Sequence, residues 1–156
     1  MTNDGYTRFH PNLYRNGKVC LSILNTWKGE GWTSCQTIRS VLLTLVSILD
    51  ETPLLNEPGI RPTNMDVIPY TETIQYKTLE YAHLHALDRD HIPPEFIAFH
   101  TYIMEYAKEN KEKVMSLCKT LSKKKKAFPE IGIYNMKRIL NYKKLYKSCE
   151  KIYESI

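Results

Sequence analysis

The chain changes character once along its length, near residue 62. Residues 1–62 are rich in turn-forming and extended residues and contain a single helical pattern, whereas the sequence from about Thr63 onward reads as helices only. With 42% hydrophobic and 25% charged residues among 156, the composition is that of one ordinary globular domain and not of a disordered tail. We therefore expect one modest core shared by a loop-rich front and a helical back.

The front contains one clear helical pattern, which follows Trp32. Thr33 and Gln36 have the spacing of a capping box, and Pro53 marks a stop. A helix that buries one apolar stripe is predicted between them. The residues of that stripe are Ile38, Val41, Leu42, Leu45, Ile48 and Leu49.

The back of the chain contains three predicted helical stretches, at residues 70–87, 94–121 and 133–156. Pro93-Pro94 marks a start and Phe128-Pro129 a break. In the last stretch, apolar residues gather on one side, and we expect this side to pack on the rest of the domain. They are Met136, Ile139, Leu140, Tyr146, Cys149, Ile152 and Tyr153.

The cysteines and histidines predict no metal site. No two of the four cysteines form the close pair that a zinc knuckle or a CxxC redox site needs, so reduced thiols are expected, with Cys118 and Cys149 acting as small buried apolar residues. The histidines of the helical part have no cysteine among them and predict ordinary surface or core positions. They are His83, His85, His91 and His100.

Charge and hydropathy predict an intracellular protein, in the cytoplasm or the nucleus, without a membrane partner. The longest apolar stretch, residues 41–49, is too short to span a bilayer. The net charge of +5 comes mostly from the back of the chain, including the run Lys123–Lys126, which predicts a solvated helix face. A basic helical protein that binds nucleic acid remains a weaker alternative, because the run lacks interleaved aromatic residues.

The most informative segment is residues 8–24. It has a turn at His10-Pro11-Asn12, a second turn at Asn16-Gly17, and then an extended approach to Cys20. An amide side chain and a thiol can thus meet on neighbouring turns. Such a pair suits acyl transfer through sulfur, in which the Cys20 thiolate holds the acyl group and Asn12 donates a hydrogen bond to the oxyanion.

His10-Pro11-Asn12, with Cys20 eight positions after the asparagine, resembles the active-site signature of ubiquitin-conjugating enzymes. Trp32 and the helix after it also resemble that family. Residues 25–29 and 56–59 resemble its large-enzyme subgroup, whose animal members include the one charged by the alternative activating enzyme. The resemblance continues weakly beyond residue 70.

This resemblance implies an α+β ubiquitin-conjugating (UBC-like) fold, with the catalytic core in residues 1–89 and a helical C-terminal extension, residues 90–156, packed on it. It also implies the reaction: an activating enzyme passes ubiquitin or a ubiquitin-like modifier to Cys20 as a thioester, and the modifier then goes to a substrate lysine, with or without a ligase. ATP is consumed upstream, so no cofactor is expected.

The resemblance also assigns roles to neighbouring residues. His10 and Pro11 are structural residues of the active-site turn, and Asn56 and Glu57 fall in a loop that flanks the active site. The family's ligase-docking loop corresponds to Trp32, Thr33, Ser34 and Cys35. Here Thr-Ser-Cys stands where the family usually has Ser-Pro-Ala, so an unusual choice of ligase is expected.

One feature departs from the family. Its fold places a helix and most of a four-stranded sheet before the His-Pro-Asn turn, but only nine residues precede His10. We expect the front of the core to lie upstream of Met1; the alternatives are a front supplied by another chain or a reduced fold. An inactive variant serving as a binding scaffold stays open, whereas a cysteine hydrolase fits poorly because no acid pairs with His10.

Overall fold

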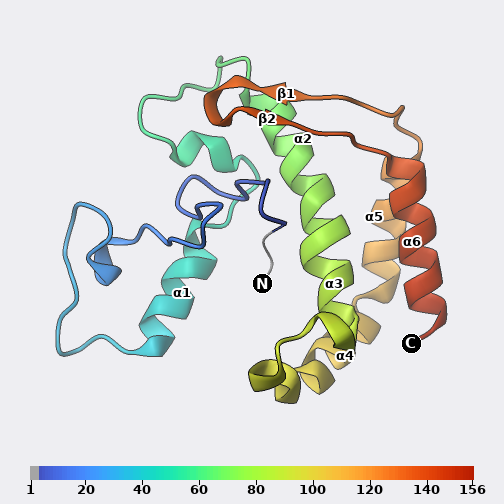
Figure 1. The fold of residues 1–156 in the computed structure, drawn as a ribbon, viewed down its shortest axis with the longest axis horizontal. Coiled ribbons are helices and arrows are strands. Elements are labelled where there is room, and N and C mark those ends of the chain that lie inside the picture. Colours follow the sequence, from blue (N-terminus) through green and yellow to red (C-terminus); the bar gives the residue numbers. More distant parts are fainter. Residues whose placement is uncertain (1–3) are drawn as a thin grey trace.

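The structure is a computed structural model that describes residues 4–156. A loop-rich N-terminal part carries helix α1 (Ile38–Ile48) on one side of the molecule (Figure 1). A central rod follows, made of α2 (Val67–Lys77), a π-helical segment (Thr78–His83) and the short α3 (Leu84–Leu87). Beyond the rod lies a helical pair, and the loop-rich part and this pair flank the rod.

The helical pair consists of α5 (Lys111–Ser122) and α6 (Tyr142–Glu154). Helix α4 (His100–Glu109) lies at the lower end of the rod in Figure 1 and leads into α5 through Asn110. The predicted helical stretches 70–87 and 94–121 are confirmed. Pro94 begins a 3-10 segment (Pro94–Phe99) before α4, as the Pro-Pro start signal predicts.

A short antiparallel hairpin runs across the top of the rod. Strands β1 (Glu130–Ile131) and β2 (Met136–Lys137) pair with Ile131 opposite Met136. They are joined by a 3-10 turn (Gly132–Tyr134) and by Asn135, whose φ of 48° is left-handed. The prediction of helix alone beyond Thr63 is therefore wrong here.

The last helix begins nine residues later than predicted. The side chain of Asn141 accepts a hydrogen bond from the Lys144 amide at 3.1 Å and caps α6, which starts at Tyr142. Met136 lies in β2 and not on the helical stripe, because Ile131 and Met136 bury the inner face of the hairpin against α2. The paired strands β1 and β2 therefore bury Met136, in place of the predicted helix face.

Helix α1 forms where expected, but its start and its burial differ from the prediction. Thr37 and Ser40 make the capping box, in which the Ser40 amide donates to Thr37 Oγ1, whereas Thr33 closes a turn with the Gln36 amide at 3.0 Å. No residue of α1 is buried, and Ile38 remains 77% exposed. The predicted buried stripe is wrong because, within residues 4–156, no element covers the outer face of this helix.

Within residues 4–156, the core forms three clusters. The largest lies between the rod and the helical pair and joins Tyr76, Leu79, Leu84, Cys118, Leu121, Leu140, Tyr142, Leu145 and Cys149. A smaller one joins α3, α4 and the end of α6 through Leu87, Ala107 and Tyr153. The third joins a 3-10 segment (Pro53–Asn56), α2 and the hairpin through Leu54, Val67, Tyr70, Ile131 and Met136. It attaches the loop-rich part to the helices.

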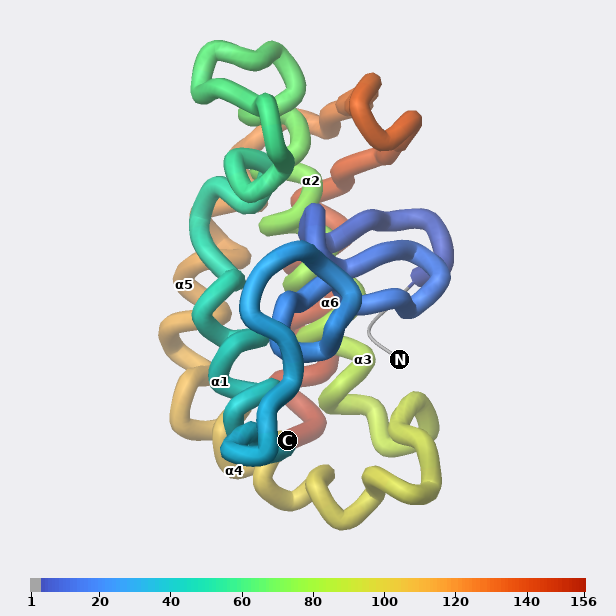
Figure 2. Tube along the Cα trace, turned by 90° about the vertical axis from the view of Figure 1, so that its left-hand side faces the viewer, coloured from blue at the N-terminus to red at the C-terminus, as the bar shows by residue number. Residues whose placement is uncertain are grey.

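The loop-rich part lies against one side of the helical rod, and Figure 2 shows its turns on the face toward the viewer. The mixed helices and small antiparallel sheet are compatible with an α+β class. No helix within residues 4–156 combines the length and apolar character that a membrane span requires. The division of the chain near residue 89 remains a prediction.

Candidate active site

Two tight turns bring Asn12 and Cys20 together. The Leu13 amide donates to the His10 carbonyl at 2.9 Å and closes the first turn. Gly17, with a φ of 86°, closes the second by donating to the Tyr14 carbonyl at 3.0 Å, and this left-handed conformation favours glycine. Leu13 pairs with Val19 between the turns, so Cys20 returns beside Asn12.

Asn12 and Cys20 are joined by two reciprocal hydrogen bonds. The Cys20 amide donates to the Asn12 carbonyl at 2.8 Å, and Asn12 Nδ2 donates to the Cys20 carbonyl at 2.7 Å. A side-chain amide nitrogen carries two hydrogens, and one is used here. The other hydrogen is not used in this pair.

His10 supports this pair from inside the protein. Its side chain is fully buried, and its Nδ1 accepts a hydrogen bond from the Asn12 amide at 3.1 Å. Since an amide can only donate, the imidazole is neutral and carries its proton on Nε2. Burial lowers the pKa of His10, an effect that the Asp50 carboxylate partly offsets. His10 thus orients the backbone of the turn.

Thr26 braces the backbone on both sides of Cys20. Its Oγ1 accepts from the Leu21 amide at 2.9 Å and donates to the Val19 carbonyl at 2.6 Å. This hydroxyl and the two hydrogen bonds between Asn12 and Cys20 together fix the backbone of residues 19–21. The sequence analysis did not single out Thr26, which lies in the segment 25–29 used there only for the subgroup resemblance.

The Cys20 side chain is only 2% exposed and faces a small cavity of about 130 Å³. The loop 56–58 and Trp27 border this cavity opposite the His-Pro-Asn turn. The structure therefore brings together Cys20, Asn12, Pro11, Asn56 and Glu57. The complete lining is Arg8, Pro11, Asn12, Tyr14, Cys20, Trp27, Asn56, Glu57 and Pro58.

Tyr134 of the C-terminal hairpin contacts two of the residues that line this cavity, Glu57 and Arg8. The Tyr134 hydroxyl donates to Glu57 Oε2, and Arg8 Nη2 lies 3.8 Å from the same oxygen. The Arg8 guanidinium stacks between two rings, 3.9 Å from the centre of Tyr14 and 4.4 Å from that of Tyr134. Burial and the hydrogen bond to Glu57 raise the pKa of Tyr134, so its hydroxyl stays protonated and donates.

The sequence carried no signal for this arrangement. Arg8 and Tyr14 stand near the His-Pro-Asn turn but match no catalytic pattern, and Tyr134 is 77 positions from Glu57. The region around Tyr134 was predicted to be helical, and a helix there does not predict a contact near Cys20. Only the hairpin places its hydroxyl there.

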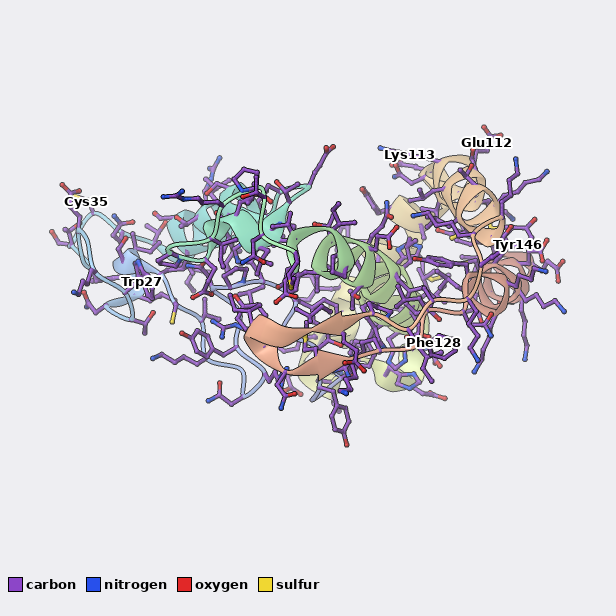
Figure 3. The ribbon with its side chains drawn as sticks, turned by 90° about the horizontal axis from the view of Figure 1, so that it is seen from above. Trp27, Cys35, Glu112, Lys113, Phe128 and Tyr146 are labelled. Atoms are coloured by element: carbon purple, nitrogen blue, oxygen red, sulfur yellow. The ribbon has the colours of Figure 1, made fainter. Side chains whose placement is uncertain are left out.

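The predicted ligase-docking residues lie apart from the cavity. Trp32, Thr33, Ser34 and Cys35 are all exposed, and the Trp32 amide donates to Asn25 Oδ1 at 3.2 Å. In Figure 3, Cys35 and Trp27 lie at the same end of the molecule. Because these side chains stand in solvent, they are available for contact with another protein. Within residues 4–156, no group of three or more metal-binding side chains gathers as a metal site requires.

The residues that line this cavity are similar to those of known proteins. The family model "Ubiquitin-conjugating enzyme" matches residues 5–73, which include every residue that lines the cavity. This match covers the loop-rich part together with the first turns of α2, and it supports the resemblance drawn from the sequence.

Several curated relatives match the same part of the chain. Human "Ubiquitin-conjugating enzyme E2 Z" is 46% identical over 83 residues, which cover 52% of this chain and 23% of that protein. The "Probable ubiquitin-conjugating enzyme protein 17" of Caenorhabditis elegans is 38% identical over 91 residues, covering 52% and 12%. Human "Dual E2 ubiquitin-conjugating enzyme/E3 ubiquitin-protein ligase BIRC6" is 50% identical over 64 residues, covering 37% and 1%. The chain thus spans about a quarter of the length of the E2 Z proteins it matches.

The buried, neutral His10 predicts that acid destabilises the fold. The unfolded chain binds a proton on this histidine below its ordinary pKa of about 6.5, whereas the folded chain, with a lowered pKa, does not. The free energy of unfolding should therefore fall as the pH decreases from about 7 to 5, with His83, whose pKa burial also lowers, adding to the trend.

Urea titrations at a series of pH values measure this slope. In His10→Asn the slope between pH 7 and 5 should be shallower than in the wild type, whatever the absolute stability of the variant. Parallel slopes in the two proteins would contradict the lowered pKa of His10.

Proposed function

We propose that this chain carries ubiquitin or a ubiquitin-like modifier as a thioester on Cys20 and transfers it to a substrate lysine. The observation that carries the proposal is the reciprocal pairing of Asn12 with Cys20 inside a cavity that an acidic residue borders. The match of residues 5–73 to the ubiquitin-conjugating enzyme model supports the same reaction. An activating enzyme, protein substrates and a ligase are the partners that this reaction implies.

Charging is an exchange of thioesters. The Cys20 thiolate attacks the C-terminal carbonyl carbon of the modifier, a new carbon–sulfur bond forms, and the bond to the cysteine of the activating enzyme breaks. That cysteine leaves as a thiolate. No ATP or other cofactor is needed at this step, because the energy is already stored in the incoming thioester.

Access to the sulfur requires local opening. Cys20 is 2% exposed, whereas Trp27 at the cavity border is 49% exposed and free to turn outward. An extended modifier tail fills a narrow channel of this kind better than a bulky domain does. We therefore assign the Trp27 side and the 56–58 loop as the parts that move when the tail enters.

Discharge uses the second hydrogen of Asn12 Nδ2. A neutral lysine amine attacks the thioester carbon and leaves an oxyanion, to which Asn12 donates while its other hydrogen stays bonded to the Cys20 carbonyl. The carbon–sulfur bond then breaks and Cys20 departs as a thiolate. The proton of the amine passes to the Glu57 carboxylate, which borders the cavity.

Tyr134 is assigned as a positioning residue that acts through Glu57. Its hydroxyl and the Arg8 guanidinium hold Glu57 Oε2 at the cavity edge, which leaves Oε1 to accept the proton of the incoming lysine amine. Residues beyond the matched part of the chain would thus take part in lysine transfer. This gives the C-terminal segment a role besides packing.

The exposed segment Trp32–Cys35 is proposed as the contact for a ligase. Its side chains stand in solvent outside the catalytic cavity, as a docking loop requires. Since it lacks the usual Ser-Pro-Ala, the ligases that it accepts should differ from those of most family members.

A charging assay tests the central step. With ubiquitin, ATP and an activating enzyme, the chain should give a shifted band on a non-reducing gel that reductant removes. In Cys20→Ser the band should become resistant to reductant, because an oxygen ester replaces the thioester. Cys35→Ser is the matched control and should charge as the wild type does. If the wild type and Cys35→Ser both show no band with any activating enzyme, the chain is a binding scaffold.

The role of Asn12 predicts a loss confined to discharge. Asn12→Ala should still charge but should pass the modifier to free lysine about a hundredfold more slowly than the wild type, because one oxyanion donor is lost. Asn110→Ala is the control, since the Asn110 side-chain amide donates to the Tyr106 carbonyl at 2.9 Å outside the cavity and should not affect discharge. Equal rates for Asn12→Ala and wild type would refute this role.

The role of Tyr134 predicts a smaller effect at the same step. Tyr134→Phe keeps the ring on Arg8 and removes only the hydroxyl that bonds Glu57, so single-turnover discharge to lysine should slow about fivefold, the equivalent of one ordinary hydrogen bond. The lysine concentration for half-maximal rate should rise, because the lysine amine meets a less ordered carboxylate. If Glu57→Gln is as fast as the wild type, Tyr134 has no catalytic residue to position.

A further inference from the structure

The helical pair contains two cysteines in contact. Cys118 on α5 and Cys149 on α6 face each other across the largest core cluster, with their sulfur atoms 3.2 Å apart. Their side chains are 1% and 0% exposed. The sequence analysis treated them as separate buried apolar residues, which their burial bears out, but it did not predict that they meet.

We propose that Cys118 and Cys149 are a redox modification site, at which hydrogen peroxide converts the thiol pair into a buried disulfide that joins α5 to α6. A disulfide needs two cysteines whose sulfurs can approach to about 2.05 Å. Small rotations of side chains already in contact supply that approach. This inference is independent of the reaction proposed for Cys20.

The hydrogen bond within the pair makes the two sulfurs unequal. The two sulfurs share one hydrogen bond, which lowers the pKa of Cys118, while the same bond and burial raise the pKa of Cys149. The thiolate is the nucleophile in sulfur chemistry. Cys118 is therefore the sulfur that attacks first, and Cys149 is the resolving thiol.

The reaction balances with one molecule of hydrogen peroxide. Cys118 thiolate attacks a peroxide oxygen, the oxygen–oxygen bond breaks, and the hydroxide that leaves takes up a proton as water, which leaves a sulfenic acid on Cys118. The sulfur of Cys149 then attacks the Cys118 sulfur as it loses its proton, and the sulfur–oxygen bond breaks to release a second water. Two thiols are oxidised and one peroxide is reduced.

The position of the pair favours this product over its competitors. Cys35 is exposed, but Figure 3 shows it at the opposite end of the molecule from Glu112 on α5 and Tyr146 on α6. A sulfenic acid on Cys118 thus meets Cys149 before any other protein thiol. Burial also keeps bulky thiols away, so we expect the bond to form slowly, during local opening of the helices, and to resist reduction.

The bond would constrain the part of the chain that carries the hairpin. It closes a loop from Cys118 to Cys149 that contains β1, β2 and Tyr134 between them. Closing a loop of this length reduces the entropy of the unfolded chain and should raise the Tm by roughly 10 °C. Oxidation would therefore stabilise the helical pair and the hairpin together.

The experiment treats the reduced 156-residue chain with hydrogen peroxide, blocks the remaining thiols by alkylation, and maps cysteine pairs by mass spectrometry after digestion. The Cys118–Cys149 linked peptide should exceed any other intramolecular pair by at least about tenfold, as expected for sulfurs already in contact. The same sample should show the raised Tm, and reductant in denaturant should reverse both changes.

Matched variants separate the pair from the exposed thiol. Cys35→Ser should form the bond like the wild type, whereas Cys149→Ala should show no rise in Tm after oxidation and should accumulate sulfinic acid on Cys118. If Cys149→Ala fails to fold, Cys118→Ala serves the same purpose, and the wild-type peptide map decides in either case. Full alkylation of both cysteines after peroxide, or sulfinic acid at Cys118 in the wild type, would overturn the proposal.

Discussion

The rest of the site depends on the two hydrogen bonds between Asn12 and Cys20. They close a short hairpin whose two turns are set by the His-Pro-Asn sequence and by Gly17, and they leave one Asn12 hydrogen for chemistry. His10 holds the first turn from the buried side, because its Nδ1 accepts a hydrogen bond from the Asn12 amide. Because a neutral imidazole is required for that bond, the histidine of this turn works as a structural acceptor. If lysine transfer needs a general base, that base must come from the border of the cavity where Glu57 lies.

That opposite border is built by residues distant in sequence. Glu57 is held by Arg8 and by Tyr134, and the second core cluster fixes the hairpin that carries Tyr134 against α2. The Tyr70 hydroxyl adds to this by donating to the Arg8 carbonyl at 2.7 Å. The site is thus a local hairpin supported by long-range contacts. The helical part of the chain stabilises the active site as well as its own core.

The local features of the fold could be predicted and the long-range ones could not. The turns before Cys20, helix α1 and the rod follow from turn residues and helical spacing, which act within a few residues. The hairpin at 130–137 was missed because two-residue strands carry little periodicity, and its apolar residues also fit a helix. The exposed stripe of α1 and the contact of Cys118 with Cys149 depend on which elements lie nearby, and sequence spacing does not contain that information.

Amide hydrogen exchange at Cys20 in the 156-residue chain measures the hydrogen bonds between Asn12 and Cys20. This amide should exchange at least about a hundredfold more slowly than in an unstructured peptide, because it donates to the Asn12 carbonyl in a buried turn. Asn12→Ala should lower that protection by removing the reciprocal bond from the side chain. If the Cys20 amide of the folded wild type exchanges at the rate of an unstructured peptide, Asn12 does not hold Cys20 in place.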